Sequence, residues 1–133
     1  MKVNADVMAV GDGLESRWRP TQADFDRFAA ISGDDNPIHV DPEFSARTRF
    51  GRTVSHGMLL YSRVWALIRG RWPGRHLLQE LMFPNPAYAE EELVIALTPT
   101  AGNPRLLEVS VRRAADGAIV LQGKCELDEG AGR

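Results

Sequence analysis

The sequence predicts an α+β domain in which one buried helix lies against an antiparallel sheet. Over residues 55–69, apolar side chains cover nearly every side of the predicted helix, and a helix that is apolar all round is enclosed by other elements. After Pro73-Gly74 the hydrophobic period changes to two, which is typical of strands. A single sheet that covers such a helix must curve around it, and its free edge then invites a partner subunit.

The length and composition predict one globular domain, residues 1–133, with residues 128–133 as a short frayed tail. Hydrophobic residues make up 44% and charged residues 26% of the chain, which argues against disorder and a collagen-like repeat. The single cysteine, Cys125, excludes an intrachain disulfide and favours a reducing compartment. No apolar run reaches the roughly 20 residues of a membrane span, and the first ten residues make a poor signal peptide. We therefore expect a cytoplasmic protein that does not contact membranes.

The first half of the chain is predicted to be helical. Thr21 is a good N-cap with Asp24 in the first turn, where the helix dipole favours acids. Gly33 is the expected end of this helix, and Asn36-Pro37 predicts a turn. A second short helix is expected after Asp41-Pro42, because proline fits a first helical turn.

The second half predicts four strands. The first covers residues 76–83, and alternating apolar residues predict three more near 93–98, 107–111 and 119–127. Asp116-Gly117 predicts a two-residue hairpin turn between the last two strands. The last three strands then form an antiparallel meander.

The formal net charge of −2 conceals a basic middle segment. Residues 1–43 contain nine acids and four bases, and residues 80–133 contain nine acids and five bases. Residues 44–79 contain no acid. Their seven basic residues are Arg47, Arg49, Arg52, Arg63, Arg69, Arg71 and Arg75. This segment fits a solvated surface, an anion site, or a face paired with the flanking acids. The near-neutral total argues against a general nucleic-acid binder.

Two short segments carry candidate chemistry. In the first, Asp34 and His39 lie five residues apart across the Asn36-Pro37 turn. A carboxylate and an imidazole that converge on one water suit proton transfer, one accepting a proton and the other delivering one. Spacing alone leaves a second interpretation open, in which the turn is only a turn and His39 is a hydrogen-bonded structural residue.

The second segment, Ser55-His56-Gly57, stands at the start of the buried helix. The first amides of a helix have no internal partners and lie at the positive end of its dipole, and a glycine lets a ligand oxygen approach the backbone closely. Such a site stabilises a carbonyl oxygen that gains negative charge in a transition state. The alternative is that Ser55 is an N-cap and Gly57 a tight-packing residue.

Together the two segments resemble a known family. Gly33-Asp34-x-Asn36-Pro37-Ile38-His39, followed by Phe50-Gly51-Arg52-x-Val54-x-His56-Gly57-Met58-Leu59, is similar to the signature of the MaoC-like (R)-specific enoyl-CoA hydratases, which have the hot-dog fold. The resemblance covers residues 21–68 closely and continues as a layout through the strands. It implies a long central helix wrapped by a curved antiparallel sheet.

The resemblance also implies the roles of individual residues. Asp34 and His39 would form the catalytic dyad, and the backbone N–H of Gly57 would polarise the thioester carbonyl. Asn36, Ser55 and His56 are expected to support the site. No metal site is expected, because no further ligand converges with Asp34, His39 and Asp41. One departure is Ala89-Glu90-Glu91-Glu92, where family members commonly show a Gly-Asp pair, so this strand end is expected to differ in shape.

The implied activity is addition of water to a trans-2-enoyl thioester to give the (R)-3-hydroxyacyl thioester, or the reverse. No cofactor is expected beyond the coenzyme A or phosphopantetheine of the substrate, and the implied assembly is a homodimer or a higher hot-dog oligomer. Coenzyme A and acyl carrier protein are both anionic, so Arg47, Arg49 and Arg71 are candidate carrier contacts. A hot-dog acyl-thioester hydrolase and a non-catalytic acyl-carrier-binding subunit remain alternatives. Acyl chain length, carrier, direction and pathway stay open.

Overall fold

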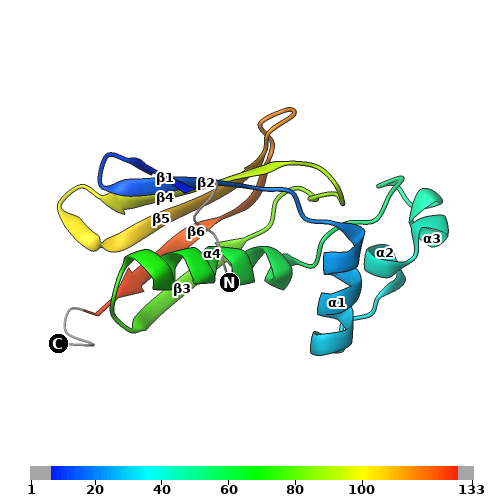
Figure 1. Ribbon diagram of the computed structural model, residues 1–133, viewed down its shortest axis with the longest axis horizontal. Coiled ribbons are helices and arrows are strands. Elements are labelled where there is room, and N and C mark those ends of the chain that lie inside the picture. The colour runs from blue at the N-terminus through cyan, green and yellow to red at the C-terminus, as the bar shows by residue number, and fades with distance from the viewer. Residues whose placement is uncertain (1–6, 129–133) are drawn as a thin grey trace.

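The computed structural model describes residues 7–128 and shows an α+β fold with a helix lying against one antiparallel sheet (Figure 1). The elements are, in chain order, β1 (Val7–Val10), β2 (Gly13–Trp18), α1 (Gln22–Ser32), α2 (Pro37–Val40), α3 (Pro42–Ala46), α4 (Gly57–Arg71), β3 (His76–Met82), β4 (Leu93–Thr100), β5 (Asn103–Arg113) and β6 (Ile119–Leu127). Helix α4 runs beneath the sheet, and α1, α2 and α3 gather at one end of the molecule (Figure 1). None of the helices in residues 7–128 is long and apolar enough to span a membrane.

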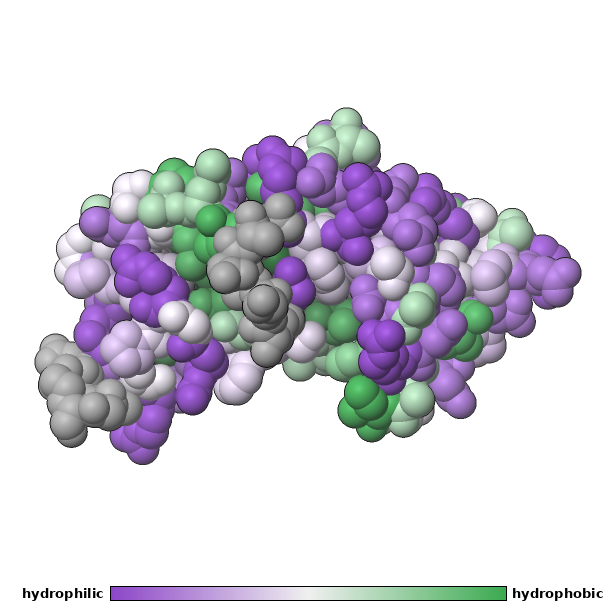
Figure 2. All heavy atoms as spheres, in the orientation of Figure 1, coloured by the Kyte–Doolittle hydropathy of each residue, from purple (hydrophilic) through white to green (hydrophobic). Residues whose placement is uncertain are grey.

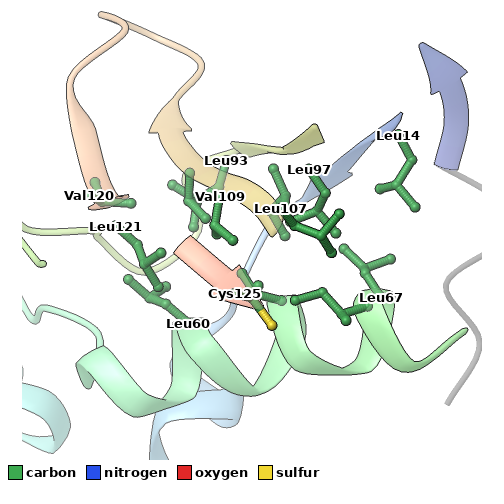
Figure 3. Close-up of a cluster of buried hydrophobic side chains, with 14 of the residues drawn as sticks. Leu14, Leu60, Leu67, Leu93, Leu97, Leu107, Val109, Val120, Leu121 and Cys125 are labelled. Carbon is green, nitrogen blue, oxygen red and sulfur yellow. The ribbon is translucent and has the colours of Figure 1, made fainter. Parts of the chain in front are cut away.

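The six strands form a single sheet in the order β1-β2-β4-β5-β6-β3, with every pair antiparallel. Its inner face and one face of α4 make the hydrophobic core, in which Leu60 and Leu67 of α4 point toward sheet residues such as Leu97 and Leu121 (Figure 3). Figure 2 shows a largely hydrophilic surface over the helical end, with apolar residues gathered along the line between the sheet and α4. The expected helix-and-sheet layout is therefore confirmed.

Strands β1 and β2 were not expected from the sequence. Strand β1 is mostly exposed and therefore lacks the two-residue alternation of a half-buried strand. In β2 the buried residues are Gly13, Leu14 and the polar Ser16, so an apolar alternation is not visible in the sequence. Gly13 marks the close approach of β2 to β4, since a Cβ there would collide with the carbonyl of Leu97. The Gly11-Asp12-Gly13 turn was the available signal for this hairpin.

Helix α4 differs from its prediction in two ways. It begins at Gly57 with His56 as the N-cap, and the hydroxyl of Ser55 donates to the carbonyl of His56, so Ser55 is not the cap. It is also only partly enclosed, because Met58 and Trp65 are exposed. The described chain covers one face of this apolar helix and leaves another face open beside β3, the edge strand that α4 contacts through Tyr61 and Gln79 (2.7 Å).

Two further expectations at the far end of the chain were wrong. The β5–β6 connection is wider than a two-residue turn, because residues 114–118 lie between the end of β5 and the start of β6. Asp116 braces it by accepting hydrogen bonds from the Arg113 guanidinium and from the backbone N–H of Ala118. Asp128 belongs to the folded domain, since its backbone N–H donates to the carbonyl of Arg75 and its carboxylate pairs with that guanidinium at 2.8 Å. The rest of the expected tail, residues 129–133, lies outside the described residues.

Candidate active site

Helix α1 delivers Asp34 to the site. As the sequence predicts, Thr21 and Asp24 form a reciprocal capping box at its start, and Gly33 ends it with a φ of 83°. A residue with a side chain rarely adopts this left-handed conformation, whereas glycine does so freely. The chain therefore turns sharply after α1. Asp34 follows directly, with its side chain 56% exposed.

Helix α2, one turn long where only a turn was expected, delivers His39. The side chain of Asn36 caps it by accepting a hydrogen bond from the backbone of Ile38 (3.1 Å), so Asn36 holds the turn that carries His39. The His39 ring is buried, and its Nδ1 lies 2.7 Å from the carbonyl oxygen of Val54. Because a carbonyl only accepts, Nδ1 carries a proton, which leaves Nε2 as the ring nitrogen that can accept or deliver a proton. That Nε2 is 3.8 Å from a carboxylate oxygen of Asp34.

His56 contacts both members of this pair. Its ring stacks on the ring of His39 with 3.8 Å between centroids, and its Nε2–H donates to the backbone carbonyl of Asp34 at 2.9 Å. Burial lowers the pKa of His56, and the edge contact with Phe28 (4.8 Å) closes the other side of the ring. Burial therefore favours the neutral form of His56, and its hydrogen bond fixes the backbone of Asp34 against the ring of His39.

Asp34, His39 and His56 bring potential metal-ligand atoms within 4.8 Å of one another. The two imidazole rings are stacked 3.8 Å apart with planes only 23° from parallel, so their in-plane lone pairs lie in two separate layers, which is unfavourable for binding one metal ion. Asp41, the other acid considered from the sequence, instead caps α3 by accepting from the backbone of Phe44. The arrangement disfavours a metal centre, and the expectation of no metal stays a prediction.

Gly57 begins α4, so its backbone N–H has no partner inside the helix. A cavity of about 210 Å³ opens beside it, lined also by Arg49, Leu60, Phe83 and Val120. The ring of Phe83 packs so closely that a Cβ on Gly57 would lie 3.0 Å from it. Asp34 and His39 do not line this cavity. The start of α4 connects the two, because Gly57 lines the cavity and the preceding His56 contacts both Asp34 and His39.

The structure separates the three arginines expected at a carrier site. Arg49 lines the cavity beside Gly57 and lies over the ring of Phe50, and Arg47 is the nearby C-cap of α3. Arg71 is fourteen residues beyond Gly57, at the last turn of α4, which places it about 21 Å along the helix axis. Within one chain, Arg71 is not part of this site.

Some of the basic segment is paired with the flanking acids. Arg52 forms an ion pair with Glu91 at 2.8 Å and donates to the carbonyl of Ala89, and Arg75 pairs with Asp128. Sequence reasoning missed the carbonyl of Val54, which orients His39. A backbone group fifteen residues away leaves no signal in residue types.

A curved antiparallel sheet around a central helix, with an Asp–His pair beside the helix N-terminus, defines a hot-dog protein with a candidate acid–base site. The family model described as MaoC like domain matches residues 7–117, and the chain belongs to this family.

Named relatives and solved structures agree with this assignment. The (R)-specific enoyl-CoA hydratase of Aeromonas caviae is 36% identical over 102 residues, which is 74% of this chain and 76% of the relative. The mitochondrial 3-hydroxyacyl-[acyl-carrier-protein] dehydratase of Arabidopsis thaliana is 33% identical over 89 residues, 66% of this chain and 54% of the relative. The unliganded R-hydratase of Pseudomonas aeruginosa superposes with a TM-score of 0.80 at 30% identity, over 93% of this chain and 83% of that chain. The (R)-hydratase of A. caviae gives a TM-score of 0.79, also at 30% identity, over 91% and 98%.

Proposed function

We propose that this protein adds water to a trans-2-enoyl thioester to give the (R)-3-hydroxyacyl thioester, and catalyses the reverse dehydration. The observation that carries the proposal is the geometry of His39, whose ring is oriented by the carbonyl of Val54 and whose Nε2 faces Asp34 at 3.8 Å. Family membership and the named activities of the relatives support it.

The chemistry follows from the positions of these groups. A water held between Asp34 and His39 adds its hydroxyl to C3 of the enoyl group, and a proton is delivered to C2 as the C2–C3 π bond breaks. Negative charge develops on the thioester oxygen, which accepts a hydrogen bond from the Gly57 N–H at the positive end of α4. The addition involves no redox change, so no cofactor is proposed beyond the carrier of the substrate.

The neutral state of His56 favours this role for His39. When His39 accepts a proton, a second cationic ring stacked at 3.8 Å would oppose the new charge. Burial lowers the pKa of His56 and prevents that conflict. The hydrogen bond from His56 to the backbone carbonyl of Asp34 holds the Asp34 carboxylate beside Nε2 of His39.

The experiment that tests the proposed function incubates the protein with crotonyl-CoA and measures enoyl-thioester absorbance and free thiol at the same time. We expect the enoyl-thioester absorbance to fall while no free thiol appears, and the reverse reaction to start from (R)-3-hydroxybutyryl-CoA. Free thiol in proportion to substrate consumed would identify a thioester hydrolase. No turnover of short or long acyl groups on either coenzyme A or acyl carrier protein would leave a non-catalytic binding subunit.

The Arg49→Glu variant should raise the KM for the charged carrier, with Arg71→Glu as the matched control near the wild-type value.

We also propose that the protein is a homodimer that pairs along β3. This strand is one of the two edges of the described sheet, opposite β1, and its apolar side chains are unusually exposed, with Met82 at 61% and Leu77 at 58%. The open face of α4, with Trp65, adjoins the same edge. A second copy related by a two-fold axis would pair the two edges and cover this surface.

Sedimentation at micromolar concentration should give twice the chain mass of 14.7 kDa. The Met82→Lys variant places a charge in the proposed interface and should shift the equilibrium toward the monomer, with Lys124→Glu, on the neighbouring strand β6, as a surface control. A wild-type protein that stays monomeric at this concentration would contradict the dimer.

A further inference from the structure

Gln22, the first residue of α1, joins three segments that lie far apart in the sequence. Its side-chain amide donates to the backbone carbonyl of His39 at 2.9 Å and to Asp26 at 3.1 Å. Its side-chain oxygen accepts a hydrogen bond from the hydroxyl of Thr53 at 2.6 Å. Gln22 is half-buried and Thr53 is buried, so water competes weakly for these groups.

These hydrogen bonds hold the two groups that position the His39 side chain, namely its own backbone and the segment that carries the Val54 carbonyl. Gln22 holds the backbone of His39 itself, and Thr53 directly precedes Val54, whose carbonyl orients the imidazole. The backbone N–H of Val54 in turn donates to the carbonyl of Ile38 at 3.0 Å. The position of His39 Nε2 relative to Asp34 therefore depends on a hydrogen-bond network that is joined at the side chain of Gln22.

Glu90 holds the N-terminal end of α1, where Gln22 lies. Its carboxylate accepts a hydrogen bond from the backbone N–H of Gln22 at 3.1 Å, at the positive end of α1. Glu90 is also the one non-glycine residue of the described chain with a positive φ, 68°. A residue with a side chain is strained at this φ. Two hydrogen bonds to the backbone of Glu90 hold the residue in this conformation. Its N–H donates to Pro20, and its carbonyl accepts from Arg19.

We propose that Gln22 is a positioning residue for the reaction, acting through His39. Glu90 holds its backbone, and its amide group sets both the backbone of His39 and the Thr53–Val54 segment that orients the ring. The inference rests on the proposed function for its kinetic readout. It extends that function to a residue whose side chain acts through the backbone of His39 and through Thr53.

The first arm of the test is kinetic. The Gln22→Met variant keeps the length of the side chain and removes its hydrogen bonds with His39, Asp26 and Thr53, so kcat for crotonyl-CoA should fall about 10- to 100-fold with KM nearly unchanged. The Gln22→Glu variant still accepts from Thr53 but cannot donate to His39, and kcat should fall similarly. The Thr53→Val variant should also lower kcat, whereas Thr53→Ser keeps the hydroxyl and should restore it. A wild-type kcat in Gln22→Met, or a loss confined to KM, would overturn the proposal.

The second arm needs no turnover. The chain has three histidines, so their ring nitrogen and proton signals can be separated by NMR. Gln22→Met should shift the Nδ1 and Nε2 signals of His39 and leave those of His76, on β3, unchanged. If the wild-type protein has no hydratase activity but this shift is present, the proposed function fails while the positioning role stands. If the wild type is inactive and the His39 signals do not move, the positioning role fails as well.

Discussion

Replacing Asp34 with Asn or His39 with Ala is expected to lower kcat for crotonyl-CoA hydration by about 10²- to 10⁴-fold, which is the usual contribution of one general acid–base group. Both groups act on one water, so losing either one stops the shared proton transfer. The double variant should therefore be little slower than the slower single variant. Asp34→Asn is the cleaner change, since the side chain is 56% exposed and its removal disturbs little packing.

His39→Ala needs a structural control, because the ring is buried, stacked on His56 and hydrogen-bonded to Val54. Circular dichroism and the melting temperature distinguish loss of chemistry from loss of fold. A folded variant of either residue that keeps more than about a tenth of wild-type kcat would contradict the assigned dyad.

Gly57→Pro is expected to lower kcat by about 10²–10³, the usual effect of deleting one donor to a developing oxyanion. Proline lacks the N–H, yet it suits the first position of a helix. The residue before it, His56, already has the extended ψ of 140° that a proline requires of its predecessor. The substitution therefore removes the proposed donor with little change to the start of α4.

Gly57→Ala is the matched control for this variant. It keeps the N–H but adds a Cβ at 3.0 Å from the Phe83 ring, a contact that the proline variant also makes. The ratio of kcat between the two variants measures the donor itself. Equal kcat values in Gly57→Pro and Gly57→Ala would show that this N–H does not stabilise the transition state.

The sequence predicted those parts of the site that depend on short segments. The capping box at Thr21, the end of α1 at Gly33 and the α2 turn at Asn36 are local. Residue types five positions apart were therefore enough to suggest that Asp34 and His39 converge, and the structure places them 3.8 Å apart. Their catalytic roles stay predictions.

The parts that the sequence did not predict depend on contacts between distant segments. The carbonyl of Val54, the amide of Gln22 and the carboxylate of Glu90 come from three regions that only the folded chain brings together. Arg71 was grouped with Arg49 because both lie in one basic segment, but a fifteen-residue helix holds them apart. The β1–β2 hairpin escaped notice because its buried positions include a serine.

In the proposed reaction the site adds water across a carbon–carbon double bond and leaves the thioester intact. Hydration of crotonyl-CoA in ¹⁸O-labelled water, followed by mass spectrometry of the products, tests it most directly. We predict intact 3-hydroxybutyryl-CoA of R configuration with one ¹⁸O on C3. Label in a free carboxylate together with released coenzyme A would contradict hydration and indicate thioester hydrolysis at this site.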